Sequence, residues 1–133
     1  MSRNIDQQRA THALQSVKEG VRKLAPAERD EWKSRANELP AMIQMNGLGS
    51  TVAFYYSKGK ASVHRKLLNT TLKPWLCQDD QSLYPNADNL MEAIINSDMH
   101  TYQIAQAEAQ AYLRWVKKFS KIYCEKEKTG ENS

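Results

Sequence analysis

Apolar residues recur at steps of three and four along most of the chain, and this spacing strongly limits the folds available to it. An α-helix has 3.6 residues per turn, so such steps place the apolar side chains along one face of a helix. The first and last examples are Ala10, Leu14, Val17, Val21 and Leu24, and Ala105, Ala109, Tyr112, Val116, Phe119 and Tyr123. The spacing predicts an all-α fold, a single compact bundle of about six helices with short connections.

The segment NELPAMIQMNGLGSTVAFYY, residues 37–56, carries the strongest competing signal. Asn46-Gly47 between two apolar segments is typical of a β-hairpin. A hairpin also requires apolar and polar side chains to alternate on both sides of the turn, whereas the apolar residues here keep steps of three and four. We therefore expect one helix to end at Asn46-Gly47, with glycine at positive φ, and the next helix to be capped by Ser50.

Other local signals place the remaining helix boundaries. Pro40 is expected to kink the second helix or to start a new turn within it. The apolar residues between 63 and 76 predict a helix that is disturbed at Pro74. A capping-box pattern at Asn89 predicts a short helix there, and Asp98 is expected to cap the last helix.

Length and composition favour one domain, at residues 1–125, followed by a frayed polar tail at residues 126–133. The chain has 133 residues and a polar, charged start unlike a signal peptide. It contains no run of about 18 apolar residues that would span a bilayer. Its two cysteines, Cys77 and Cys124, lack CxxC spacing and are expected to be free thiols. We expect a cytoplasmic protein without a membrane segment.

The charges are segregated along the chain, although the net charge is only +4. Residues 39–78 contain five basic and no acidic side chains, residues 79–113 contain six acidic and no basic ones, and residues 114–121 contain four basic ones. Such segregation predicts a surface with one end suited to anions and the other to a basic partner. The alternative, that folding brings the blocks together as ion pairs, stays open with nearly equal weight.

The sequence contains no pattern that requires a catalytic, metal or cofactor site. Its histidines, His12, His64 and His100, are far apart, and none has a metal-binding partner at i+3 or i+4. The phosphate-binding GxxxxGK[ST], dinucleotide-binding GxGxxG and nucleophile GxSxG motifs are all missing. We therefore expect no enzyme activity. The alternative is a stand-alone helical enzyme or regulator that uses the region of His64.

Two clusters of basic residues are the candidates for a binding site. One face of the last predicted helix, opposite its apolar stripe, carries four cations at i, i+3, i+4 and i+7: Arg114, Lys117, Lys118 and Lys121. The second cluster surrounds a glycine turn and includes His64 and Lys66; its expected contacts are Lys58, Lys60 and Arg65. Outward cations on a helix can follow a phosphate backbone without reading bases. A solvated helix end that complements the helix dipole is the alternative for the lysines.

Four aromatic residues lie near these clusters in the sequence: Tyr55, Tyr56, Trp75 and Trp115. Exposed aromatic rings would provide surfaces on which bases stack. Aromatic residues at helical spacing are more often part of the core, so we expect core positions for these four.

Four segments of the chain, taken in order, resemble a known family. They are Arg9-Ala10 on the first helix, ELPAMIQMNGLGSTVAFYYSKGK at 38–60, LKPWL at 72–76 and YQIAQAEAQAYLRWVKKFSK at 102–121. Together they resemble the small subunit of the type III-B CRISPR effector, the Cmr complex, over nearly the whole chain. The resemblance implies an all-helical, non-catalytic subunit of an RNA-guided antiviral ribonucleoprotein. Target cleavage would belong to the backbone subunits, and nucleotide cyclase and DNase activity to the large subunit.

The resemblance also implies partners. In that family several copies of the small subunit stack beside the backbone subunits and line the channel for target RNA. The expected partners are therefore guide RNA, target RNA, the backbone and large subunits, and further copies of this chain. The acidic block is expected to meet a basic face of a neighbouring subunit or of a second copy, through Asp79, Asp80, Asp88, Glu92 and Asp98. A scaffold that contacts only protein is the remaining alternative.

Overall fold

The computed structural model describes residues 4–78 and 82–125, and the regular elements in this part of the chain are all α-helices. Its seven helices are α1 (Ile5–Arg22), α2 (Pro26–Asn46), α3 (Leu48–Tyr56), α4 (Val63–Thr70), α5 (Leu72–Cys77), α6 (Leu90–Ile95) and α7 (Met99–Tyr123). The all-α prediction is confirmed, and the count is one above the expected six because residues 63–76 form two helices. Asp79, Asp80 and the predicted tail at 126–133 lie outside the described residues.

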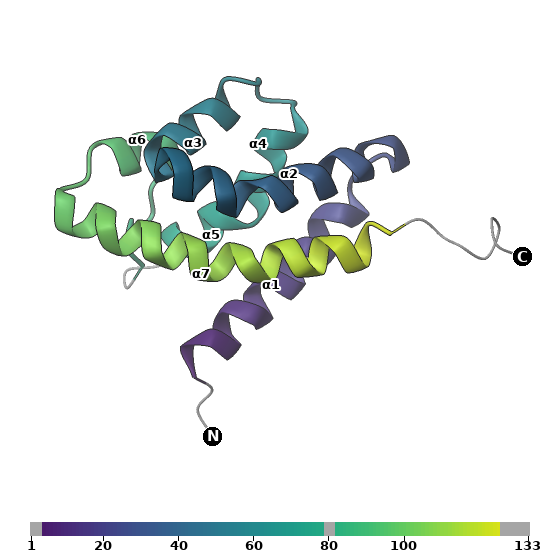
Figure 1. Ribbon diagram of the computed structural model, residues 1–133, viewed down its shortest axis with the longest axis horizontal. Coiled ribbons are helices and arrows are strands. Elements are labelled where there is room, and N and C mark those ends of the chain that lie inside the picture. Colours follow the sequence, from purple (N-terminus) through teal and green to yellow (C-terminus); the bar gives the residue numbers. More distant parts are fainter. Residues whose placement is uncertain (1–3, 79–81, 126–133) are drawn as a thin grey trace, which may run out of the picture.

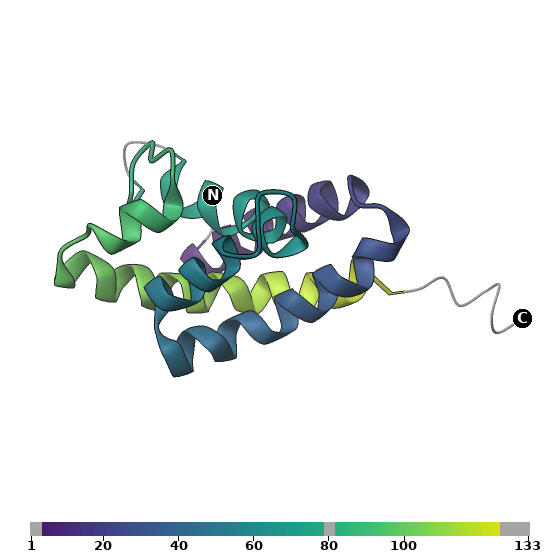
Figure 2. The same cartoon turned by 90° about the horizontal axis from the view of Figure 1, so that it is seen from above.

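Helix α7 runs along most of the length of the molecule, and α1 and α2 make the most extensive contacts with it. Helix α1 crosses α7, whereas α2 lies alongside it (Figures 1 and 2). Helix α4 packs against α1, α2, α3 and α5, and α6 packs against α3. None of the helices in the described part of the chain has both the length and the apolar character needed to cross a membrane.

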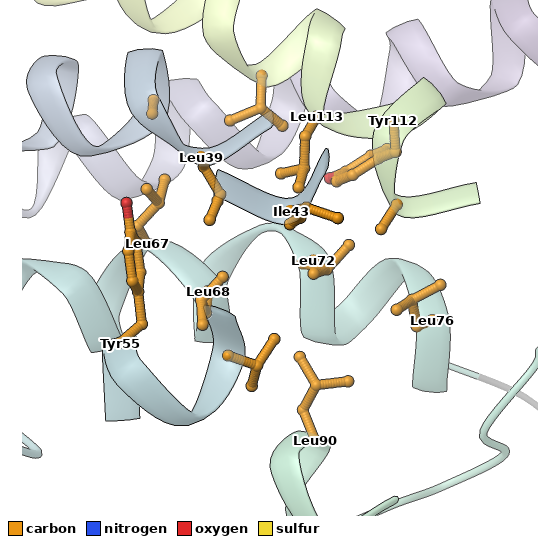
Figure 3. Close-up of a cluster of buried hydrophobic side chains, with 14 of the residues drawn as sticks. Leu39, Ile43, Tyr55, Leu67, Leu68, Leu72, Leu76, Leu90, Tyr112 and Leu113 are labelled. Carbon is orange, nitrogen blue, oxygen red and sulfur yellow. The ribbon is translucent and has the colours of Figure 1, made fainter. Parts of the chain in front are cut away.

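Buried apolar side chains from all seven helices form one continuous core, and Figure 3 shows the part where α2 to α7 meet. Leu39 and Ile43 of α2 are fully buried there, as their spacing predicted. The aromatic residues singled out from the sequence also belong to this core or pack against it: Tyr55 and Tyr56 are buried, and Trp75 and Trp115 are partly buried.

The corner at Asn46-Gly47 is helical on both sides, as expected, and is not a hairpin. Helix α2 ends at Asn46, α3 begins at Leu48, and Gly47 alone connects them. Gly47 has a φ of 90°, in the left-handed region that glycine tolerates, so the predicted role of this residue is confirmed. Helix α2 continues through Pro40, so no new helix starts there.

The start of α3 differs from the prediction. Ser50 is not the cap, because α3 begins two residues earlier. Its first amides are satisfied by side chains of α7: the N–H of Leu48 donates to Gln106 Oε1 (2.9 Å), and the N–H of Gly49 donates to Tyr102 Oη (2.8 Å). These acceptors lie 58 and 53 residues further along the chain, so no local pattern reveals them.

The helix expected over residues 63–76 is interrupted at Thr71, and Pro74 explains the break. Proline has no N–H to donate, and its ring clashes with the carbonyl oxygen four residues earlier, here that of Thr70. Helix α4 ends at that residue, and α5 starts at Leu72 with Pro74 in its first turn, where proline is tolerated. The disturbance was therefore predicted for the right reason but placed three residues too late.

Trp32 occupies the junction of α1, α2, α4 and α7. Its side chain is fully buried, and its Nε1–H donates to Ser120 Oγ of α7 (2.8 Å). A Cβ atom at Gly20 of α1 would lie 2.5 Å from the indole carbon Cη2 and 3.0 Å from Thr70 Cγ2 of α4. Helix α1 can approach this junction because residue 20 has no side chain.

Replacing Gly20 with alanine is expected to destabilise the fold by about 1–3 kcal/mol, because the added methyl group overpacks the ring of Trp32. At an unhindered helix position the same change would stabilise by about 1 kcal/mol, since alanine is the better helix former. Urea unfolding followed by circular dichroism measures the difference. Gln15→Ala at an exposed site of the same helix is the control and should change stability by less than about 0.5 kcal/mol. A stabilised Gly20→Ala variant would contradict the tight approach.

Candidate nucleic-acid interface

The four cations predicted on the last helix are all exposed in the C-terminal half of α7. We call this set the α7 cationic row: Arg114, Lys117, Lys118 and Lys121. Tyr112 and Val116 are buried on the opposite face of the helix, as the apolar stripe predicted. Within the described residues, no member of the row forms an ion pair with a carboxylate. The row is therefore available to an external anion.

One flank of the row borders a groove of about 150 Å³ between α2 and α7, which we call the α2–α7 groove. It is lined by Lys33, Ser34, Asn37, Lys117 and Lys121. Three ammonium groups, a hydroxyl and an amide therefore surround one space, and all of them can donate to phosphate oxygens. Lys33 forms an ion pair with Glu125, whose Oε1 lies 3.9 Å from Nζ. No carboxylate is among the described residues that line the groove.

The other flank, toward α1, has mixed charge. A hollow of about 140 Å³ there is lined by Asp6, Arg114, Trp115 and Lys118. Trp115 Nε1–H donates to Asp6 Oδ1 (3.1 Å), and this hydrogen bond holds the pKa of Asp6 below its usual value. The ammonium group of Lys118 lies 5.2 Å from the centre of the Trp115 ring. Because an ionised Asp6 repels phosphate, the α2–α7 groove is the better anion site of the two.

Lys33, Ser34 and Asn37 are the site residues that sequence reasoning missed. They lie on one side of α2, because Asn37 comes four residues after Lys33 and three after Ser34, and both spacings make neighbours on a helix. That spacing was a usable signal, but α2 carries both charges along its length, and only its packing against α7 shows which face meets the cationic row.

The second predicted cluster lies at the turn between α3 and α4, beyond α2 from α7 (Figure 1). Arg65 is engaged within the protein, since Nη1 donates to the carbonyl oxygen of Tyr56 (3.2 Å) and Cζ lies 3.9 Å from the centre of the Tyr56 ring. Lys58 Nζ lies 4.6 Å from the centre of the Phe54 ring, and Lys60 is exposed. The structure does not bring the two basic clusters together, and RNA contact by the second cluster stays a prediction.

The described acidic residues of the predicted contact surface lie beside the N-terminus of α7, at the end of the molecule opposite the cationic row (Figure 1). Asp88 and Glu92 are exposed next to and within α6, and Asp98 caps α7 as predicted. The same end exposes 60% of Ile95 and 76% of Met99. We use the name acidic end for the three acidic and two apolar residues of this surface: Asp88, Glu92, Asp98, Ile95 and Met99.

The charge blocks stay apart after folding. Among the described residues, no ion pair joins the acidic block at 79–113 to the basic blocks at 39–78 and 114–121. Glu108 of the acidic block pairs with Arg9 of α1, whose Nε and Nη2 donate to its two carboxylate oxygens at 2.7 and 2.8 Å. The described residues therefore support the bipolar surface and not the interleaved alternative.

Two of the histidines have partners inside the protein. His12 Nδ1 lies 2.7 Å from Tyr112 Oη, and burial lowers the pKa of this imidazole. His64 Nε2 accepts from Arg35 Nη1 (3.2 Å), and burial lowers the pKa of His64 as well. Within residues 4–78 and 82–125, no group of three or more His, Cys, Asp and Glu side chains is placed to hold a metal ion.

Comparisons with known proteins agree with one another. The family model of a CRISPR-associated protein, Cas_Cmr5, matches residues 5–123. Among solved structures, the chain is similar to the crystal structure of a CRISPR-associated Cmr5 family protein from Thermus thermophilus, with a TM-score of 0.73 and 25% sequence identity. That similarity covers 92% of this chain and 100% of the other.

Proposed function

The chain belongs to the Cmr5 family of CRISPR-associated proteins and is a subunit of the type III-B Cmr complex, and on that premise we propose that it is a non-catalytic structural subunit that contacts RNA. The proposed role is to hold the phosphate backbone of RNA along α7 and to stabilise the assembly around it. The residues that match the family model, 5–123, include the α7 cationic row and both of its flanks.

The combination of the α7 cationic row with the α2–α7 groove is the observation that supports this proposal. The groove contains Lys33 together with Lys117 and Lys121, two of the four cations of α7. Residues 114 to 121 span about 10 Å of helix, which is long enough to face more than one phosphate of a strand. Lysine and arginine contacts to phosphate carry no base information, so they suit a subunit that accepts RNA of any sequence.

The acidic end supports the second part of the proposal, a contact with a neighbouring subunit. Exposed Ile95 and Met99 would supply apolar contact area, and Asp88 and Glu92 would favour a basic partner face. Cations at the opposite end of α7 that are not bound to RNA give a second copy such a face. A head-to-tail contact of this kind repeats from copy to copy and builds a stack.

Reversing Lys117 and Lys118 to glutamate tests the RNA contact. We expect the assembled complex to retain target RNA less well. We also expect the full chain alone to bind single-stranded RNA roughly tenfold or more weakly near 0.1 M salt, with a shallower salt dependence. Fluorescence anisotropy over a salt series measures the affinity, and filter retention measures the complex.

The double variant Lys58→Glu with Lys60→Glu is the matched control, since it makes the same charge change at the turn between α3 and α4. We expect a smaller loss there because the turn lies away from α7. Unchanged RNA retention by a normally assembled complex carrying K117E and K118E would contradict the proposal. Crosslinking that joins the chain to protein but not to RNA would favour the protein-only scaffold, and metal-dependent nuclease activity of the purified chain would favour the enzyme.

A further inference from the structure

The surface between α1, α5 and α7 is hollowed next to Trp75. Two adjoining hollows of about 400 and 390 Å³ share three lining residues: Gln8, Trp75 and Gln78. Volumes of this size are typical of sites that bind small organic groups. Neither cluster of basic residues lines them, so this feature, which we call the Trp75 hollow, is separate from the α7 cationic row.

The indole of Trp75 is held in a fixed position. Its Nε1–H donates to Glu108 Oε2 (2.8 Å), and Glu108 is in turn held by the guanidinium of Arg9. The ring also stacks on Tyr112, with 5.2 Å between ring centres and 4° between ring planes. A ring that is fixed before binding loses little conformational entropy when a planar group stacks on it.

The polar groups of the second hollow are neutral. Besides Gln8, Trp75 and Gln78, this hollow is lined by Thr11, His12, Gln15 and Ser16. Burial lowers the pKa of His12, so its imidazole is uncharged at pH 7. None of the described lining residues then carries a charge that would hold a phosphate. Amides and hydroxyls both donate and accept hydrogen bonds, so they match a neutral planar ligand with donors and acceptors on its edge.

We propose that the Trp75 hollow binds an unpaired nucleobase, with the base stacked beside the Trp75 indole and its edge bonded by the amides of Gln15 and Gln78. Aromatic stacking combined with side-chain hydrogen bonds to the edge is how proteins hold bases of single-stranded RNA. The base comes from an RNA strand or from a free nucleoside. Only the first source rests on the proposed function.

Two RNA oligomers of equal length test this inference with the full chain, one an oligoadenylate and the other an abasic ribose-phosphate chain. We expect the oligoadenylate to bind about tenfold more tightly, because the stacking of one base contributes on that order. In the Gln15→Ala, Gln78→Ala variant this advantage should fall to about threefold or less. Trp75→Leu should abolish it. Fluorescence anisotropy gives both affinities, and thermal unfolding identifies variants that do not fold.

Gln44→Ala with Gln103→Ala is the matched control, because both are exposed glutamines outside the hollow. It should leave the ratio of the two affinities unchanged. K117E with K118E should weaken both oligomers and leave the ratio unchanged as well. The two proposals can therefore be tested independently. Equal affinity of the natural chain for the two oligomers would overturn the base site. RNA binding by the K117E, K118E variant as tight as that of the natural chain would overturn the proposed contact with the RNA backbone.

Free adenosine distinguishes the two sources of the base. Saturable quenching of tryptophan fluorescence by adenosine, lost in the Gln15→Ala, Gln78→Ala variant, would support the hollow as a site for a free nucleoside. A preference for the oligoadenylate without adenosine binding would support a base within a strand. An affinity ratio that survives the replacement of Trp75 in a folded variant would overturn the inference.

Discussion

Replacing Trp32 with alanine is expected to lower the free energy of unfolding by about 3–5 kcal/mol, as for other large aromatic residues in cores. Trp32 is fully buried where four helices meet, and its removal would leave a cavity between α1 and α7. It would also leave the hydroxyl of Ser120 without its donor in a buried site. Domains of this size are stabilised by only about 5–15 kcal/mol, so the variant should be close to unfolding at 37 °C.

Urea unfolding of the full chain, followed by circular dichroism in the far ultraviolet, measures this loss. Trp115→Ala is the matched control, since it removes the same side chain from a partly buried position whose Nε1–H bonds only an exposed carboxylate, that of Asp6. We expect a clearly smaller loss there. A loss for Trp32→Ala below about 1 kcal/mol would show that the junction is not the centre of the core.

The helices themselves could be predicted from the sequence, because the spacing of apolar residues along the chain defines the apolar face of each helix. Leu39 and Ile43 lie one turn apart in the chain and share the core in the structure. The end of α2 was also predictable, because it is set by local chemistry, namely the positive φ that Gly47 adopts. The start of α3 was not, because its amides bond to Gln106 and Tyr102 of α7, and sequence spacing carries no information about contacts that distant.

The candidate site was likewise predictable from the sequence only where local spacing determines it. The row on α7 could be predicted since four cations at helical spacing opposite an apolar stripe must face outward. Lys33 could not be assigned to it, because local spacing does not show which residues of α2 lie next to the cationic row. Arg65 shows the converse: its charge suggested an external anion, but its guanidinium contacts the backbone and ring of Tyr56.

Reversing the three lysines of the α2–α7 groove, Lys33, Lys117 and Lys121, to glutamate is expected to weaken binding of single-stranded RNA roughly 100-fold at low salt. Each exposed ion pair contributes up to about 1 kcal/mol, and reversal adds repulsion to its loss. The slope of log K against log salt should become shallower by about 2, since each phosphate contact on a single strand contributes about 0.7. Anisotropy titrations over a salt series measure both quantities.

Two further variants test whether RNA binds at the α2–α7 groove. The same three lysines replaced by arginine keep the charge, so this variant should bind RNA as the natural chain does if the groove acts through its cations. Reversal of Arg114 and Lys118, on the flank that contains Asp6, should cost clearly less, because the ionised carboxylate already weakens phosphate binding there. Both charge-reversal variants should unfold at the same temperature as the natural chain. If the reversal of Arg114 and Lys118 then costs more RNA affinity than the reversal of the three groove lysines, RNA lies on the side of α7 that faces α1. The assignment of RNA to the α2–α7 groove would then be wrong.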